Sequence, residues 1–215
     1  MSFTIVISHY NENLDWIQML PSDHIHLYSK GGHMLHNAKY KTSYLPNVGR
    51  ESQTYLHYII EHYENLPDIV FFTQGCDDHI NSQEIIQCIS TLFDPMNKNI
   101  NFISNRIEAR MINNVYFTED HRFIYWKGDS LHPAECNFKE WFTKYICPSF
   151  DYSGPLYISF GACFAIRKEA ILSRSKEYYN TLIEQLNTHT NTEVGHFFER
   201  SWIHIFNSKD NITRI

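Results

Sequence analysis

The sequence predicts an α/β fold, namely a single domain with a mostly parallel central sheet flanked by helices. Short apolar runs rich in β-branched and aromatic residues predict strands near residues 3–8, 25–28, 69–73, 101–104 and 157–166. Segments with apolar residues at helical spacing alternate with several of these runs. With 215 residues, of which 43% are hydrophobic, the chain is long enough to bury one substantial core.

The composition excludes several classes of protein. Aromatic residues make up 15% and charged residues 20% of the chain, which describes a folded globular protein rather than a disordered one. A net charge of −6, without a run of Lys or Arg, argues against general nucleic-acid binding. The five cysteines form no CxxC pair, so we expect reduced thiols in the cytoplasm rather than disulfides or structural zinc. No apolar run is long enough to predict a signal peptide or a membrane span.

The first predicted strand ends in the polar sequence Ser8-His9-Tyr10-Asn11-Glu12. A small polar group, an aromatic ring and an amide at the carboxyl end of a strand can receive a nucleobase by stacking and edge hydrogen bonds. A turn and the N-cap of a short helix through Leu14, Ile17 and Leu20 explain the same residues equally well.

The second predicted strand is followed by a long polar stretch, residues 29–47, which we interpret as a loop of functional length. The histidines in or near it match no zinc spacing, and we expect them to lie mostly on the surface. They are His24, His26, His33 and His36.

A helix is predicted to follow Asn47-Val48-Gly49-Arg50-Glu51, because apolar residues from Tyr55 to Tyr63 recur at helical spacing. Arg50, in the first turn of that helix, opposes the helix dipole. Such a cation is usually held by an anion. Arg50 is therefore a candidate ligand for a diphosphate, with an ion pair to Glu51 or another acid as the alternative.

The strand predicted over residues 69–73 leaves through Gly75 into Asp77, Asp78 and His79. In an open α/β sheet, ligands bind at the carboxyl ends of the strands. Carboxylate oxygens placed there can hold Mg²⁺ or Mn²⁺ against the phosphates of a nucleotide. The alternative is that Asp77 starts a turn and Asp78 caps the helix predicted from about residue 82.

The second half of the chain is less regular. Residues 106–155 are rich in aromatic residues and interrupted by prolines, which suits an acceptor-binding region and equally suits ordinary packing. Gly161, inside the last predicted strand, indicates close approach by another backbone or a ligand. In the last predicted helix, Glu199 and Arg200 lie beside the apolar face. There an acid can point into a cleft or form an ion pair.

Several of these segments also carry a resemblance to a known family. They are Ser8-His9-Tyr10-Asn11-Glu12, Asn47-Val48-Gly49-Arg50-Glu51, Tyr55-Leu56-His57-Tyr58-Ile59-Ile60, Leu66-Pro67-Asp68, Gln74-Gly75 with Asp78-His79, Phe164-Ala165-Ile166-Arg167 and Gly195-His196-Phe197-Phe198-Glu199-Arg200-Ser201-Trp202. Together, and in this order over nearly the whole chain, they resemble GT-A-type glycosyltransferase domains. Large DNA viruses of algae encode such domains for capsid glycans, and a fungal and bacterial family of unknown function shares the pattern.

The resemblance implies a GT-A-like, Rossmann-like domain over residues 1–215, with a nucleotide-sugar half at about 1–105 and an acceptor half at about 106–215. It also implies a UDP-sugar donor, a glycan acceptor and Mn²⁺ or Mg²⁺ as the cofactor. For a viral enzyme, the location would be the host cytoplasm.

The resemblance further implies roles for particular residues. Ser8, His9, Tyr10 and Asn11 would hold the nucleoside, and Gly161 and Ala162 would line the cleft between donor and acceptor. Arg50 and Asp77 are the other predicted nucleotide-sugar-binding residues, with Arg50 as the candidate for the diphosphate. The two family aspartates flank one residue, whereas Asp77 and Asp78 are adjacent. We expect Asp78 to bind the metal, with support from Asp77.

Glu199 would be the general base of an inverting transfer, with its pKa raised by the rings of Phe197 and Phe198. The alternative is that Arg200 pairs with Glu199 and lowers its pKa. Two other classes of function stay open. One is a metal-dependent hydrolase of phosphodiesters or sugar phosphates, and the other is a nucleotide-sugar-binding module without turnover.

Overall fold

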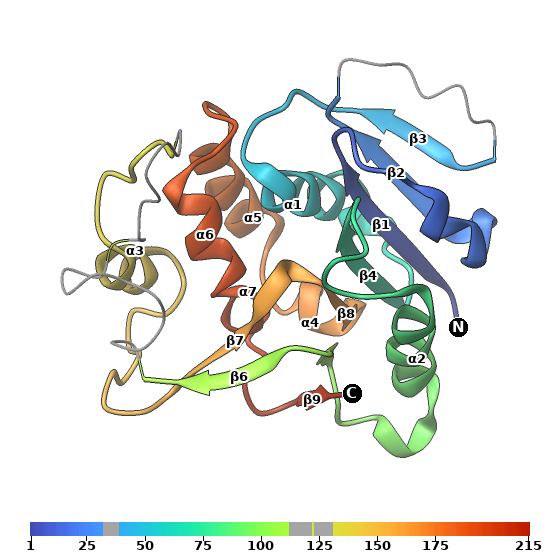
Figure 1. The fold of residues 1–215 in the computed structure, drawn as a ribbon. Helices are drawn as coiled ribbons and strands as arrows, with labels where there is room; N and C mark the ends of the chain where they lie inside the picture. The colour runs from blue at the N-terminus through green and yellow to red at the C-terminus, as the bar shows by residue number, and fades with distance from the viewer. Residues whose placement is uncertain (32–38, 112–121, 123–130) are drawn as a thin grey trace.

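The computed structural model of the protein describes residues 1–31, 39–111, 122 and 131–215. A seven-stranded sheet with the order β3-β2-β1-β4-β8-β5-β9 forms its centre (Figure 1). Neighbouring strands run parallel in the pairs β1–β2, β1–β4, β2–β3 and β5–β9, while β8 is antiparallel to both β4 and β5. The predicted α/β fold with a mostly parallel central sheet is confirmed.

Four predicted strands lie within a residue or two of their expected bounds, because each is a compact apolar run. They are β1 (Phe3–His9), β2 (Ile25–Ser29), β4 (Ile69–Gln74) and β5 (Phe102–Ser104). Three further strands were not predicted, β3 (Lys41–Tyr44), β6 (Ile107–Arg110) and β9 (Ile212–Arg214). The interpretation of residues 29–47 as loop throughout is therefore wrong at β3, whose polar, half-exposed residues form the edge of the sheet.

The single strand predicted over residues 157–166 is also wrong. The chain forms β7 (Leu156–Ser159), a 3₁₀ turn over Phe160–Ala162 and then β8 (Phe164–Arg167). β7 leaves the central sheet and pairs with β6 (Ile107–Arg110) in a separate two-stranded sheet. The break occurs because Gly161 and Ala162 have left-handed backbones, with φ values of 81° and 52°, which no strand contains.

The helices cover both faces of the sheet. They are α1 (Arg50–His62), α2 (Ser82–Phe93), α3 (Phe138–Tyr145), α4 (Lys168–Leu172), α5 (Lys176–Ile183), α6 (Glu193–Glu199) and α7 (Trp202–Ile205). A capping box of Asn81 and Glu84 starts α2, so the alternative that Asp78 caps this helix is wrong. Thr192 caps α6, because its side chain accepts from the Gly195 amide.

Successive side chains of β1 and β4 point to opposite faces of the sheet, which divides the core into two layers. Val6 and Phe72 pack in the cluster under α1 and the carboxyl-terminal helices, and Ile5 and Phe71 pack in the cluster under α2. Each fully buried side chain of this size contributes about 1.5–3 kcal/mol to folding. The two layers fix the strands against each other and thereby fix the positions of their carboxyl ends.

The structure agrees with the expectation of free cysteines and disagrees with the expectation of a surface position for one histidine. All five cysteines are free thiols. His26 is buried, so its expected place on the surface is wrong. His33, His36 and much of the aromatic stretch between residues 106 and 155 lie outside the described residues. Among the described helices, none combines the length and the hydropathy that a membrane crossing requires.

Candidate functional site

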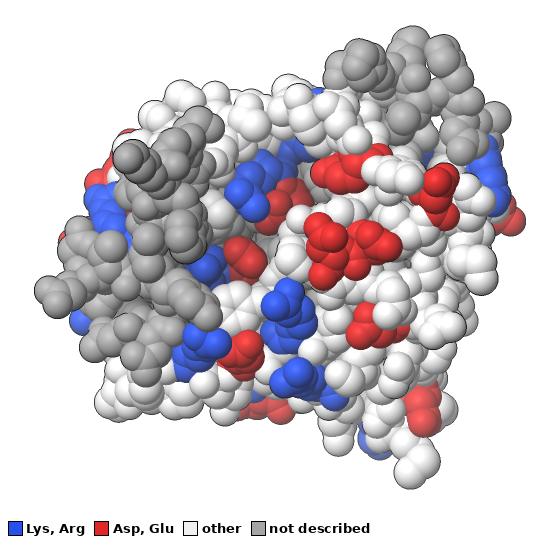
Figure 2. Space-filling view, viewed as in Figure 1, with Lys and Arg blue, Asp and Glu red and all other residues white. Residues whose placement is uncertain are grey.

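A cleft of about 360 Å³ opens where three parallel strands end and α1 begins. The register pairs Ser8 with Gln74 and His9 with Ser29, which brings the carboxyl ends of β1, β2 and β4 together. Figure 2 shows basic and acidic side chains around a hollow in this face of the molecule. The residues that line the cleft are Ser8, His9, Tyr10, Glu12, Lys30, Asn47, Arg50, Glu51, Gln74, Thr190 and Asn191.

The end of β1 supplies three of the predicted nucleoside-binding residues. The Ser8 hydroxyl lies 2.9 Å from the Thr54 hydroxyl, and the Tyr10 amide donates to the Glu12 carboxylate at 2.7 Å. The Tyr10 ring is 47% exposed and is free to stack against a flat ligand. Asn11 is exposed and does not line the cleft.

His9 is buried beside the same strand end. Its Nε2 lies 3.1 Å from the Glu12 carbonyl oxygen, which can only accept, so Nε2 carries the proton in the neutral ring. Nδ1 is then an acceptor, and it has no hydrogen-bond partner among the described residues.

The cationic side of the cleft is built from Lys30 and Arg50. Lys30 is only 6% exposed, and its ammonium donates to the carbonyls of Val48 and Arg50, each at 2.5 Å. Burial lowers the pKa of Lys30 to about 8, against the opposing effect of the Glu51 carboxylate.

Arg50 begins α1 with a left-handed backbone at φ 54°, directly after Gly49 at φ 62°. One guanidinium nitrogen donates to Asn191 at 3.2 Å and lies 3.4 Å from Nε2 of His196. The Glu51 carboxylate lies 3.6 Å from Nε, so the predicted alternative of an ion pair is present. With 34% of its side chain exposed, Arg50 still presents charge to the cleft.

Asp77 and Asp78 follow the end of β4, and both are exposed and do not line the cleft. Gly75 lets the Glu12 side chain approach this strand end closely, because a Cβ here would lie 2.6 Å from the Glu12 carboxylate. Burial and the neighbouring Asp78 and Glu12 carboxylates raise the pKa of the Cys76 thiol, although a backbone hydrogen bond from Asp78 opposes them.

Asp77 and Asp78 offer only part of the coordination shell of a metal ion. Within the described ranges, no group of three or more His, Cys, Asp or Glu side chains is arranged to hold a metal ion. Two exposed carboxylates fit Mg²⁺ or Mn²⁺ only if a bound diphosphate completes the coordination, as is usual for nucleotide-bound Mg²⁺.

Gly161 and Ala162 are buried and do not line the cleft, so that expectation is wrong. They form a turn beneath it instead. The Gly161 carbonyl accepts from Gln74 at 2.8 Å, and the Ala162 carbonyl accepts from the Tyr55 hydroxyl at 3.0 Å. The close approach predicted at Gly161 is made by a side chain, because a Cβ there would lie 2.9 Å from the His79 ring.

Glu199 holds the same turn from the other side. Its carboxylate accepts from the Gly161 amide at 2.9 Å and from Arg200 at 3.0 Å. Burial alone would raise the pKa of Glu199, but the His196 imidazole, the Arg200 charge and the Gly161 amide outweigh burial and lower it to about 2.

The expectation that Phe197 and Phe198 raise the pKa of Glu199 is therefore wrong. Both rings are fully buried and pack against Trp141 in the core. A carboxylate with so low a pKa is a weak proton acceptor at neutral pH.

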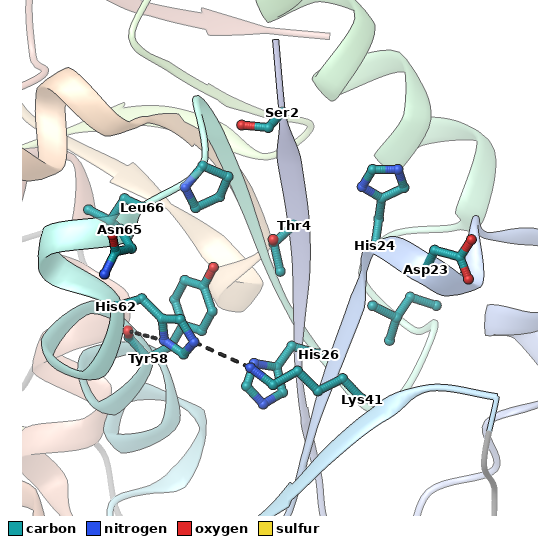
Figure 3. A pocket seen from close by; sticks show the side chains of 12 residues that line it. Ser2, Thr4, Asp23, His24, His26, Lys41, Tyr58, His62, Asn65 and Leu66 are labelled. Atoms are coloured by element: carbon teal, nitrogen blue, oxygen red, sulfur yellow. Dashed lines mark hydrogen bonds between the residues drawn. The ribbon is translucent and has the colours of Figure 1, made fainter.

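A second pocket, of about 310 Å³, lies at the opposite, amino-terminal end of β1 and β2 (Figure 3). Its basic side chains bond to protein groups. His26 lies 2.9 Å from the Ser43 hydroxyl, and Lys41 donates to His62 at 3.5 Å. Burial, with the charges of Lys41 and His62, lowers the pKa of His26 to about 3, so this histidine is neutral.

Four of the predicted nucleotide-sugar-binding residues, Ser8, His9, Tyr10 and Arg50, line the cleft, and Lys30, which was not predicted, lines it as well. Lys30 directly follows β2. Ligands bind at the carboxyl ends of parallel strands, and this principle applies to the end of β2 as it does to the ends of β1 and β4. Asn191 could not be predicted in this way. It reaches the cleft and accepts from Arg50 on a loop that lies 141 residues away in the sequence.

Comparisons with known proteins identify a family. Residues 5–214 match the family described as "Protein of unknown function (DUF3431)". No curated protein matches the chain. Among solved structures, the fold is similar to that of CMP:2-keto-3-deoxy-manno-octonic acid synthetase complexed with CTP, at 9% identity and a TM-score of 0.47. The similarity covers 100% of this chain and 89% of the synthetase chain, and at this level it identifies no activity.

Proposed function

The chain belongs to the DUF3431 family of proteins of unknown function, and we propose that it transfers a sugar from a nucleotide-sugar, a UDP-sugar, to a hydroxyl of a glycan acceptor. The observation that supports this most is one arrangement at the carboxyl edge of the sheet. Lys30 and Arg50 line the cleft together with Gln74, the last residue of β4, and the exposed Asp77 and Asp78 follow in the chain directly after that strand end.

A diphosphate matches the cationic side of this arrangement. Two buried or half-buried cations facing one cleft favour an anionic ligand, because opposite charges about 4 Å apart near a protein surface attract by roughly 4 kcal/mol. Arg50 has guanidinium hydrogens beyond the one that it donates to Asn191, and these can reach a ligand in the cleft. The exposed Tyr10 ring is the stacking surface for the base.

Asp77 and Asp78 would hold Mn²⁺ or Mg²⁺ together with the oxygens of the bound diphosphate. Such an ion, when bound, neutralises the charge that develops on a leaving nucleoside diphosphate. Asp78 is assigned as the main ligand and Asp77 as its support.

We assign Glu199 to holding the Gly161–Ala162 turn rather than to taking the acceptor proton. Its bonds to Gly161 and Arg200 support this role, and its lowered pKa counts against a base. An inverting reaction was expected because Glu199 was the predicted general base, so this assignment removes the reason for expecting it. The same observation favours the binding module without turnover as the second candidate function.

The test is a binding screen of nucleoside diphosphates and nucleotide-sugars with Mn²⁺ or with EDTA, measured as a shift in melting temperature. We expect UDP and UDP-sugars to stabilise the protein, and to do so more strongly with Mn²⁺. Transfer to a glycan acceptor separates an enzyme from a binding module. If no nucleotide stabilises the protein under either condition, the proposal is wrong.

A further inference from the structure

We propose that Lys30 is a positioning residue whose ammonium closes the turn at residues 48–50 and so aims Arg50 at the diphosphate. The inference rests on the proposed binding of a nucleotide at this cleft. It concerns a residue that acts through Arg50, whereas Arg50 itself would touch the ligand.

The position of Lys30 is fixed by its own strand. Its amide donates to the His9 carbonyl at 2.8 Å, which ties it to the end of β1. Its side chain is buried and crosses from β2 to the start of α1. The ammonium therefore joins the end of β2 to the start of α1 at the cleft.

The turn that Lys30 joins has an unfavourable backbone. Gly49 and Arg50 are two successive left-handed residues, and Arg50 has a Cβ that disfavours this conformation. The turn is held from outside by the Gly49 amide, which donates to the His189 carbonyl at 2.7 Å. From inside, the carbonyls of Val48 and Arg50 both accept from the Lys30 ammonium.

The ammonium thus satisfies two carbonyls that converge because of the left-handed turn. Hydrogen bonds to a charged donor are about twice as strong as neutral ones, so removal of the charge weakens this side of the turn. Strained backbone persists only where its surroundings enforce it. Without Lys30, we expect the turn to relax and Arg50 to leave its place beside Asn191.

The first experiment is a double-mutant cycle on UDP affinity, measured by calorimetry with Mn²⁺. Lys30→Met keeps the length of the side chain and removes the charge, and Arg50→Gln removes the proposed diphosphate ligand. We expect each single change to weaken UDP binding about tenfold or more. The double variant should bind no more weakly than Arg50→Gln alone, because Lys30 acts through Arg50. Losses that add, or unchanged affinity in Lys30→Met, overturn the inference.

The second experiment needs no nucleotide. Hydrogen exchange of a peptide spanning residues 45–54 should be faster in Lys30→Met than in wild type and should stay unchanged in Lys98→Met. The Lys98 side chain is exposed, and it forms no hydrogen bond or ion pair within the part of the chain that the structure describes. Equal exchange in Lys30→Met and wild type overturns the inference.

These two experiments separate the inference from the proposed function. If wild type does not bind UDP while exchange is faster in Lys30→Met, the closure of the turn stands and the proposed function fails. Lys30→Gln, which keeps N–H donors without the charge, replaces Lys30→Met in both experiments if the latter does not fold. The outcomes that support or overturn the inference are then the same as for Lys30→Met.

Discussion

Replacement of Glu199 by glutamine tests what this carboxylate does. Its pKa falls from an ordinary 4.5 to about 2 in the folded protein. Each unit of pKa corresponds to about 1.4 kcal/mol, so the ionised carboxylate stabilises the fold by roughly 3 kcal/mol at pH 7. Breaking a buried ion pair costs about 3–5 kcal/mol, and Arg200, which is 5% exposed, would lose its carboxylate. Both routes predict that Glu199→Gln lowers the free energy of unfolding by about 3 kcal/mol.

The pH dependence gives this prediction a sign. Because the folded pKa is lowered, the stabilisation is fully present above the unfolded pKa of about 4.5 and is lost as the pH falls through about 2. The difference in unfolding free energy between wild type and Glu199→Gln should therefore shrink to less than half between pH 7 and pH 3.

Urea unfolding at both pH values measures this difference, with Glu64→Gln, an exposed glutamate, as the control. The folded variant should bind the nucleotide and transfer sugar close to wild type. Unchanged stability together with a hundredfold loss of transfer would refute the reasoning and restore Glu199 as the base.

Two further predictions concern the cleft and the turn beneath it. Because burial, partly opposed by the Glu51 carboxylate, lowers the pKa of Lys30 to about 8, its charge is present below that pH and lost above it. UDP affinity should hold at pH 7 and fall several-fold by pH 9.5 in wild type, and a calorimetric titration showing no fall would contradict this. Gly161→Ala should lower the free energy of unfolding by about 1–3 kcal/mol, because φ is 81° and the new Cβ would lie 2.9 Å from His79. Gly154→Ala, where the nearest atom lies 3.8 Å from the new Cβ, should change stability little in the same urea titration.

The strands that organise the fold were predictable because burial on both faces demands an apolar run, as Ile69–Gln74 illustrates. β3 was not predictable in this way, because the polar Lys41–Tyr44 segment is half exposed at the sheet edge. The break at Gly161 was hidden because apolar residues flank it on both sides. Only its left-handed backbone, which the sequence signals weakly, separates β7 from β8.

The candidate site divides in a similar way. Residues at strand ends, such as His9, follow from the rule that ligands bind at the carboxyl edge of a parallel sheet. The roles of Lys30 and Glu199 follow from partners distant in the sequence. Lys30 bonds to the Val48 carbonyl 18 residues away, and Glu199 bonds to Gly161 at a separation of 38 residues. The expected pKa of Glu199 had the wrong sign because His196, Arg200 and the Gly161 amide contact its carboxylate and outweigh the effect of burial.

The central claim is that this cleft binds a nucleoside diphosphate through a metal held by Asp77 and Asp78. Calorimetric titration of UDP, with Mn²⁺ and with EDTA, tests it in wild type, Asp78→Asn and Asp77→Asn, with the exposed Asp23→Asn as a matched control. We expect wild type and Asp23→Asn to bind UDP at least tenfold more tightly with Mn²⁺ than with EDTA. Asp78→Asn should lose most of that difference, and Asp77→Asn should lose less of it. UDP affinity that is unaffected by Mn²⁺, or that is the same in Asp78→Asn as in wild type, would contradict the claim.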